Sequence, residues 1–408
     1  MTGEYFTPEQ LAEIHAYHRP QYVELALHPF YSLAGLLLVA FVLNRPLYRG
    51  AERLAAGLAP VGRRVAQVPG LRVFPQLCAR LWGQPGSGAA LLYMLGVFST
   101  YALLAFPGHL FFEFFWAHRF GMSRESFAHF LGDKAKSLGI SAVCFSALGF
   151  GVFGLARRLP RWWLALGGVC AGLLLVSPFL DPYRARLYYA QAPLPDSPLR
   201  TAITRLLGEA RVEFENVVVE KTAATGAFVD GYFAGQGATR SIVLNDEMVS
   251  QFSTDEVLAA VAHEAGHVHQ SRWLRKLAAS LALVMFLGLV QAMLALAGRR
   301  RWLGVESSSD IRALPLVQLL FFLLVSLVGP VSAADSRRTE ADADRFALDV
   351  TRRPVAYASM LAKAARLNKM DPEPPRWAHF LYGGHPTIAE RIALAESWPA
   401  SLPNPLLP

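Results

Sequence analysis

The stretch VAHEAGHVHQ, residues 261–270, carries histidine and glutamate at a spacing that suits metal chemistry. On an α-helix, residues four apart differ by about 40° around the axis, so His263 and His267 project side by side and can share one metal ion. Glu264 lies about 100° from His263, near enough to take a proton from a water on that ion without being a ligand. His269, about 240° round, lies on another face, and we expect it at the surface or at an interface. The spacing predicts a hydrolytic zinc site with Glu264 as general base; the alternative is an ordinary solvated helix face.

A third zinc ligand is expected in SRRTEADADRFALD, residues 336–349, because zinc in hydrolases usually takes three protein ligands and keeps one position open. Glu340 and Asp344 are four apart and share a helix face. Glu340 could complete the site, and Asp344 could accept the spare ring N–H of a ligand histidine. An acid-rich helix is more often only solvated. Three neighbouring acids compete for the ligand role: Asp335, Asp342 and Asp349. We expect one zinc ion per chain.

The helix that carries the histidines has a clear start at STDE, residues 253–256, where Ser253 and Glu256 form a capping box. No glycine or proline follows between Arg272 and Leu277, so we expect the helix to continue into the next apolar run. APLPDSP, residues 192–198, indicates a linker. Three short strands are predicted before the helix, at 212–220, 227–234 and 241–244. The second is either an ordinary strand or an edge that pairs with an extended substrate.

The composition is that of a membrane protein, with 53% hydrophobic and 17% charged residues. Six apolar runs approach the roughly 20 residues that cross a bilayer. They are Phe30–Leu43, Ala89–Phe106, Leu138–Ala156, Trp162–Leu180, Leu277–Ala297 and Ala313–Val331. Residues 51–82 are rich in arginine and do not suggest a span, although a degenerate seventh could lie in the interface. Glu113, within FFEFF, must lie at the interface or line a wet cavity.

The basic residues do not indicate nucleic-acid binding, despite the net charge of +8. They cluster beside apolar runs, as in Arg157, Arg158 and Arg161 and again at 299–301, which is typical of loops that fix membrane topology. The three cysteines have no paired spacing, so we expect neither a disulfide framework nor a zinc ribbon. No basic segment precedes an early apolar run, so the first span should be retained as an anchor.

Four regions follow from these patterns: 1–180, a membrane region of about four spans; 181–276, a polar catalytic region with a small sheet and the zinc helix; 277–331, two further spans; and 332–408, a C-terminal segment with the third ligand. We expect a multi-pass protein of a bacterial cytoplasmic membrane.

The motif with the two histidines and the acid-rich segment at 336–349 resemble those of the integral-membrane zinc proteases of the CAAX prenyl protease 1 type. The likeness rests on HEAGH and, two apolar runs later, SRRTEADADRFA. Four further segments are similar: HRFGMSRESFAHFLGDKAKS (118–137), DPYRARLYYAQAPLPDSPLRTAI (181–203), GYFAGQGATRSIVLNDEMV (231–249) and HPTIAERI (385–392). The resemblance runs from about residue 90 to the end, with a weaker match before it.

The resemblance implies a mainly α protein: a polytopic helical membrane barrel of six or seven spans around a chamber, with a zincin-like module containing a small sheet. It implies that His263, His267 and Glu340 bind zinc, that Glu264 is the base, and that two later residues, His385 and Arg391, support the transition state. The substrate would be a peptide or protein cleaved near a prenylated C-terminus. Independently of the likeness, Thr387 and Glu390 form a second capping box, which places His385 just before a helix.

Two departures from the family pattern matter. Thr225, Gly226 and Ala227 stand where the family has Ser-Asn-Ala, so an amide that could hold peptide is lost. The arginines after the first span indicate that this loop is cytoplasmic, opposite to the side that the family's catalytic part would require. Two alternatives to a prenyl protease remain at this point: a quality-control metalloprotease that cuts misfolded membrane proteins, and a non-catalytic membrane transporter or metal-binding scaffold.

Overall fold

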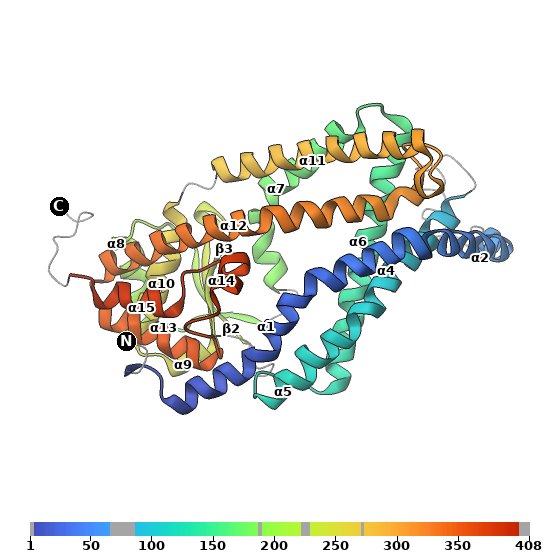
Figure 1. The fold of residues 1–408 in the computed structure, drawn as a ribbon. Coiled ribbons are helices and arrows are strands. Elements are labelled where there is room, and N and C mark those ends of the chain that lie inside the picture. Colours follow the sequence, from blue (N-terminus) through green and yellow to red (C-terminus); the bar gives the residue numbers. More distant parts are fainter. Residues whose placement is uncertain (1–3, 66–85, 187–189, 222–228, 271–272, 400–408) are drawn as a thin grey trace.

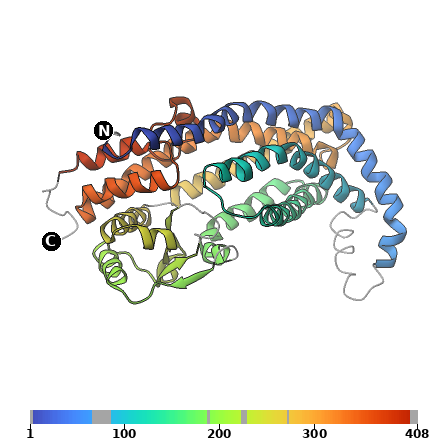
Figure 2. The ribbon, with the colours of Figure 1, turned by 90° about the horizontal axis from the view of Figure 1, so that it is seen from below.

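The computed structural model describes residues 4–65, 86–186, 190–221, 229–270 and 273–399. Long helices extend to one end of the molecule, and shorter helices with a small sheet form a compact module at the other (Figure 1). The chain passes between the two parts several times, so helices from both halves of the sequence lie along one another (Figure 2). The elements expected to carry the chemistry meet in this compact module, which we call the catalytic module and which includes the second half of the long helix that carries Glu340.

Five helices are long and apolar enough to cross a membrane in the described part of the chain: Pro8–Leu58, Gly88–Arg119, Phe127–Arg158, Trp273–Arg300 and Ile311–Thr351. They correspond to five of the six predicted spans. The sixth predicted span, 162–180, lies on α7 (Trp162–Arg186). The apolar part of this helix, Trp162–Ser177, is shorter than the other five spans. The expected helical membrane architecture is therefore confirmed.

The first span is much longer than the short run predicted for it. α1 (Pro8–Leu37), the π-helical η2 (Leu38–Leu43) and α2 (Asn44–Val65) follow one another without a break. Thr7 and Gln10 form a capping box that starts α1 well before the apolar run. The helix extends into the polar N-terminal residues because one side of α1 packs on the catalytic module, where Ile14 joins its core.

The other membrane helices are α4 (Ser87–His109) with the π-helical η3 (Leu110–Trp116) and α5 (Ala117–Arg119), then α6 (Phe127–Arg158), α11 (Trp273–Arg300) and α12 (Leu314–Thr351). Two short 3₁₀ turns, η5 (Trp302–Gly304) and η6 (Ile311–Ala313), join α11 to α12. A core of apolar side chains from these helices includes Tyr93, Phe153, Trp162 and Leu294, each at most 1% exposed. Many other apolar side chains face outward, as lipid-facing surfaces require.

The catalytic module contains a four-stranded sheet with the order β1-β2-β4-β3. β2 (Asn216–Glu220), β3 (Gly231–Ala234) and β4 (Ser241–Asn245) confirm the three predicted strands, although β2 and β3 are shorter than predicted. β1 (Gln191–Pro193) was not predicted, because its proline-rich sequence reads as a linker; it pairs at the edge with β2. β2 and β4 are parallel, and the other pairs are antiparallel.

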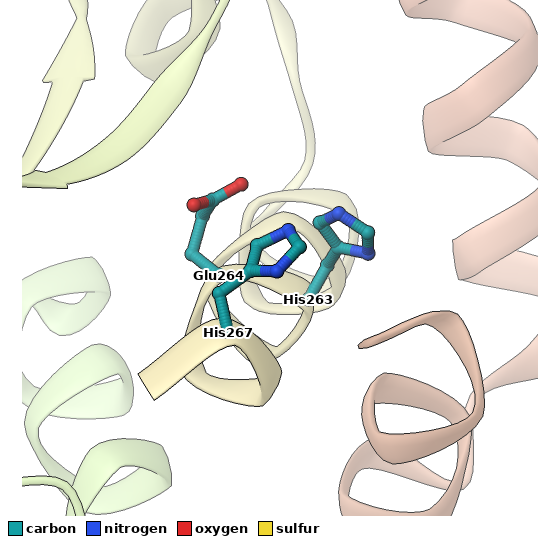
Figure 3. Close-up of side chains that lie close together, drawn as sticks. All are labelled: His263, Glu264 and His267. Carbon is teal, nitrogen blue, oxygen red and sulfur yellow. The ribbon is translucent and has the colours of Figure 1, made fainter. Parts of the chain in front are cut away.

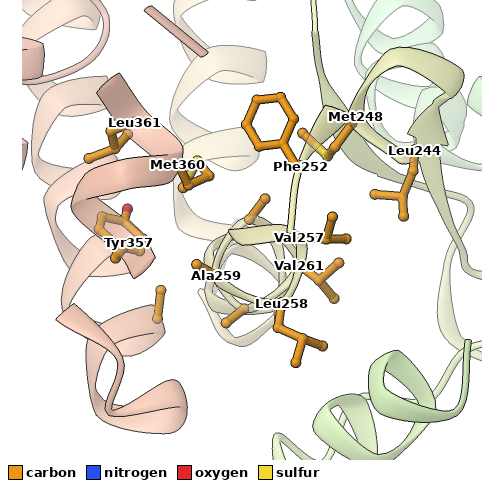
Figure 4. Close-up of a cluster of buried hydrophobic side chains, with 14 of the residues drawn as sticks. Leu244, Met248, Phe252, Val257, Leu258, Ala259, Val261, Tyr357, Met360 and Leu361 are labelled. Carbon is orange, nitrogen blue, oxygen red and sulfur yellow. The ribbon is translucent and has the colours of Figure 1, made fainter. Parts of the chain in front are cut away.

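Helices enclose this sheet and bury the zinc-type motif. They are α8 (Pro198–Glu209), α9 (Asp246–Gln251), α10 (Thr254–His269), α13 (Pro354–Leu367), α14 (Arg376–Tyr382) and α15 (Ile388–Glu396). α10 lies between the sheet side, represented by Leu244 and Met248, and α13, represented by Tyr357 and Leu361 (Figure 4). Burial of an aliphatic side chain such as Val257 contributes about 1.5–3 kcal/mol, so this packing holds α10 firmly in place.

Candidate active site

α10 begins as the sequence predicts but ends earlier. Ser253 and Glu256 make the predicted capping box, with the Glu256 carboxylate accepting from the backbone N–H of Ser253 at 2.8 Å. The prediction that the helix runs on into the membrane is wrong, because Gln270 is extended, with ψ at 124°. α11 starts separately at Trp273. The histidines thus lie on a helix of the catalytic module and not on a membrane span.

The two histidines of the motif project side by side from α10 (Figure 3). The ring centroids of His263 and His267 are 4.9 Å apart, and their planes are nearly perpendicular, at 87°. One ligand atom each from His263, Glu264 and His267 lies within 4.8 Å of the others. His269 projects elsewhere and contacts the backbone oxygen of Ala210 at 2.7 Å.

Glu340, on α12, lies opposite both imidazoles. Its two carboxylate oxygens are 3.1 Å from His263 Nε2 and 3.5 Å from His267 Nε2. Two atoms that share a tetrahedral zinc at bond lengths of about 2.0–2.1 Å are about 3.3 Å apart. Two imidazole nitrogens and one carboxylate form a common donor set for catalytic zinc, so these residues fit the ion in both chemistry and spacing.

Close packing of α10 on α12 brings Glu340 within this reach. A Cβ at Gly266 would lie 2.9 Å from the Cα of Ala343, nearer than such carbon atoms come to each other. The glycine between the two histidines therefore lets the backbones approach. Two of the three acids that competed for the ligand role, Asp335 and Asp342, are exposed, and Asp342 pairs with Arg345 at 2.8 Å.

Behind His263 lies a buried network centred on Asp344, which is 1% exposed. Asp344 Oδ1 is 2.9 Å from His263 Nδ1. Arg391 donates to the same carboxylate through Nε and a terminal nitrogen, at 2.9 Å and 2.7 Å, and the Tyr357 hydroxyl also donates to it. Because Asp344 approaches Nδ1, it favours the tautomer in which Nε2 is free to bind a metal.

The electrostatics of the pocket favour a cation at the histidines. Burial alone lowers the pKa of His263, but hydrogen bonds with Asp344 and Glu340 raise it to about 9. Burial raises the pKa of the Glu264 carboxyl, while the two imidazoles oppose that rise. Burial likewise lowers the pKa of Arg391, but Tyr357 and Asp344 hold it above its usual value, so this guanidinium stays charged.

His385 and Arg391 occupy different sides of the site. His385 Nε2 is 3.4 Å from Glu340 Oε2, so this imidazole faces the same space as the Nε2 atoms of the motif. Arg391, only 8% exposed, lies on the Nδ1 side of His263, at 3.4 Å. The predicted capping box of Thr387 and Glu390 is confirmed, and it starts α15 directly after the His385 loop.

A cavity of about 490 Å³ opens beside Glu264 and His267. It lies between α10 and β3, and Tyr232 and Phe233 of that strand line it. Among the described strands, β3 lies at the edge of the sheet. An edge position is one of the two alternatives predicted for this strand. Residues 225–227, which depart from the family pattern, lie outside the described residues.

A second, larger cavity of about 1430 Å³ lies between α1 and α4. Glu113 lines it and pairs with Lys134 and His109, which agrees with the cavity that was one of the two predicted places for this carboxylate. Both π-helical segments contribute to its wall, η2 through Leu38 and η3 through Phe112. π-helical segments are rare in proteins, and those that occur are often found at functional sites.

Three further polar residues of the site were not predicted. Gln270 accepts from His267 Nδ1 at 3.3 Å and donates to the Thr339 backbone oxygen at 2.7 Å. Arg337 donates to the backbone oxygens of His379 and Gly383, at 3.1 Å and 2.6 Å, and so holds the loop that leads to His385. Tyr357 is the third. Each is distant in sequence from most of its partners, so no local pattern could have identified it.

Comparisons with known proteins agree with this geometry. The model of peptidase family M48 matches residues 193–399, and the model for the N-terminal region of CAAX prenyl proteases, with five membrane helices, matches residues 64–184. An uncharacterized metalloprotease of Bacillus subtilis, YhfN, is 30% identical over 287 residues, which are 68% of this chain and 66% of that protein. A CAAX prenyl protease 1 homolog of Oryza sativa subsp. japonica is 23% identical over 312 residues, 75% of this chain and 73% of the other.

The crystal structure of S. mikatae Ste24p has a similar fold, with a TM-score of 0.70, and the match covers 95% of this chain and 99% of that one at 16% identity. The M48 model alone covers about half of the chain, and it includes the motif helix, Glu340 and the His385 loop. The chain belongs to peptidase family M48 and is a multi-pass membrane metalloprotease of the CAAX prenyl protease type.

Proposed function

We propose that this protein is a zinc-dependent endopeptidase in which His263, His267 and Glu340 hold one zinc ion. The observation that carries the proposal is the convergence of Glu340 on both Nε2 atoms, at 3.1 Å and 3.5 Å. Zinc bound there would polarise the scissile carbonyl and lower the pKa of water. The remaining chemistry belongs to the side chains of this protein.

Glu264 is the general base in this proposal. Its carboxylate lines the cavity beside His267, and it takes a proton from the attacking water and passes it to the leaving amine. His385 faces the same space and can donate a hydrogen bond to the oxyanion. Arg391 acts indirectly, because its guanidinium holds Asp344 against His263 on the side away from Glu340.

The cavity beside β3 suits an extended peptide. An edge strand offers backbone N–H and C=O groups, and a substrate that pairs with them lies along α10 with its scissile bond near Glu264.

Glu264→Gln tests the base. The variant should keep its zinc and lose about 10²-fold or more in turnover. Glu256→Gln is the control, since it makes the same chemical change at the start of the same helix, where an amide also completes a capping box. Wild-type turnover in Glu264→Gln would remove Glu264 from the mechanism.

A lipid-modified substrate is favoured over an unmodified one by the second cavity. Most of its lining is apolar, and it includes Tyr382 at the end of α14, three residues before His385. A lipid chain in this cavity would place the attached peptide near the catalytic centre. A farnesylated peptide should therefore be cleaved with a higher kcat/KM than the same peptide without the lipid. Equal values would favour the quality-control alternative.

With a Bacillus relative among the matches, we place the protein in a bacterial cytoplasmic membrane.

A further inference from the structure

Asn368, at the C-terminal end of α13, binds the chain just before β3 begins. Its side-chain oxygen accepts from the backbone N–H of Val229 at 2.8 Å, and its amide nitrogen donates to the backbone oxygen of the same residue at 3.0 Å. Both residues are buried, with Asn368 8% and Val229 6% exposed. One side chain thus satisfies both backbone polar groups of Val229 and fixes the entry to β3.

β3 needs such an anchor because it is short and lies at the edge of the sheet. It has four residues and pairs with β4 along one side, and among the described strands none pairs with its other side. Beyond this pairing, the backbone N–H of Asn245 donates to the backbone oxygen of Asp230 at 3.2 Å. Strands with few backbone partners open more easily than central strands, so the contact with Asn368 limits the movement of β3.

The turn that follows Asn368 is held by the first membrane helix, α1. His18 Nε2 lies 2.7 Å from the backbone oxygen of Lys369, and the Tyr22 hydroxyl donates to the Asp371 carboxylate at 2.8 Å. The Asp371 side chain is only 6% exposed, so its hydrogen bond with Tyr22 is shielded from water. α1 therefore contacts the chain one and three residues beyond Asn368, and it restrains the side chain that binds Val229.

The backbone of this turn has a conformation that needs support. Lys369 has a φ of 47°, in the left-handed region where a helix usually ends with glycine. The lysine side chain reaches α1, where its Nζ pairs with Glu13 at 2.6 Å. Glycine would adopt this conformation more easily but would not make that contact. The turn after α13 is thus stabilised by its contacts with α1.

We infer that Asn368 is a positioning residue for the substrate strand, and that α1 keeps it in place through His18 and Tyr22. The inference rests on the proposed function, in which an extended peptide pairs with β3 beside Glu264. A strand that is fixed before the peptide arrives loses less freedom on binding, which strengthens binding. His18 and Tyr22 also line the larger cavity between α1 and α4, so a ligand in that cavity touches the residues that hold Asn368.

Asn368→Ala tests the anchor with two measurements on the detergent-purified protein, and the first needs no activity. Backbone hydrogen exchange of the segment 229–235 should become about 10-fold or more faster, because Val229 loses both of its partners. The KM for a farnesylated peptide should rise more than kcat falls, with zinc affinity unchanged. Leu207→Ala, fully buried on α8, is the control for a general loss of stability: it should speed exchange throughout the catalytic module without singling out 229–235.

The outcomes separate this inference from the proposed function. Wild-type exchange at 229–235 in Asn368→Ala, or selectively faster exchange there with an unchanged KM, overturns the inference. Absence of any cleavage by the wild-type protein would refute the proposed function, and the exchange measurement would still decide whether Asn368 holds β3.

Tyr22→Phe tests the part played by α1 with a smaller change, which also serves if Asn368→Ala does not fold. Loss of the hydrogen bond to Asp371 should speed exchange of 229–235 about 3-fold or more and raise the KM. Tyr17→Phe is the matched control: the Tyr17 ring packs on Phe120, and its hydroxyl has no hydrogen-bond partner in the described part of the chain. It should leave exchange and KM at wild-type values. Equal behaviour of the two variants would remove α1 from the inference.

Discussion

Asp344 is the residue at which metal binding and the stability of the site can be separated. Its carboxylate contacts His263 Nδ1 at 2.9 Å and Arg391 at 2.7 Å, and it is almost fully buried. Asp344→Asn keeps the size of the side chain but removes its charge. The buried guanidinium of Arg391 then has no anion beside it, and loss of one partner of such a pair costs about 3–5 kcal/mol of folding free energy.

The second effect of Asp344→Asn is on zinc. Removal of the partner that orients a ligand histidine typically weakens metal binding 10–100-fold, or about 1.4–2.7 kcal/mol. Zinc affinity is measured by competition with a chromophoric chelator, and stability by thermal unfolding in detergent with and without zinc. Asp342→Asn is the matched control: it lies two residues away on α12, is exposed, and should change the unfolding free energy by less than about 1 kcal/mol.

A double variant distinguishes the two effects. Arg391→Met removes the charge that Asp344→Asn leaves unpaired, so the combined variant should be more stable than the sum of the single changes predicts. Its zinc affinity should remain low, since His263 still lacks its partner. Wild-type zinc affinity and stability in Asp344→Asn, or equal losses in Asp342→Asn, would refute this account of the network.

Three further predictions concern residues that the structure alone identifies. Gln270→Leu should weaken zinc binding about 10-fold or more, because His267 loses the acceptor for its Nδ1 hydrogen. Gln270→Glu keeps an acceptor and should retain most of the affinity. Equal zinc affinities of the two variants would contradict the role of Gln270 as the partner of His267. Arg337→Ala should lower kcat by about 10-fold or more with zinc affinity unchanged, because the His385 loop loses its clamp, and Arg338→Ala, exposed next to it, should have no such effect. Gly266→Ala should destabilise the protein by about 1–3 kcal/mol and weaken zinc binding, because the added Cβ pushes α10 and α12 apart. Gly208→Ala, where the Cβ meets open space, should not destabilise the protein. Thermal unfolding measures the stability of both variants, and chelator competition measures their zinc affinity.

The parts of the site that could be predicted are those written in short segments of sequence. His263, Glu264 and His267 follow from the helix period, and the capping boxes at Ser253 and Thr387 mark where α10 and α15 begin. The membrane helices follow from runs of apolar residues of sufficient length. In each case the physical cause is local, so the sequence pattern and the structure agree.

The features that could not be predicted arise from contacts between distant segments. The end of α10 at Gln270 is one, since no glycine or proline marks it; the Gln270 side chain instead binds His267 and the Thr339 backbone. The far-side position of Arg391 is another, because it depends on where α15 meets α12 and not on its own sequence neighbours. β1 was missed because three residues beside prolines gain their strand geometry only by pairing with β2.

α12 explains why the distant contacts converge. Arg337, Glu340 and Asp344 follow one another at intervals of three and four residues, so they lie along one face of the helix. From that face they reach the His385 loop, both motif histidines, and the pair of Tyr357 and Arg391. The same helix is a membrane span in its first half and has no break before these residues. A shift of α12 by about 1 Å would change every contact of Glu340 and Asp344 at once, and such a displacement is enough to reduce catalysis about 10²-fold. The membrane part therefore does more than anchor the peptidase, because the span itself sets the position of Glu340, the proposed third zinc ligand.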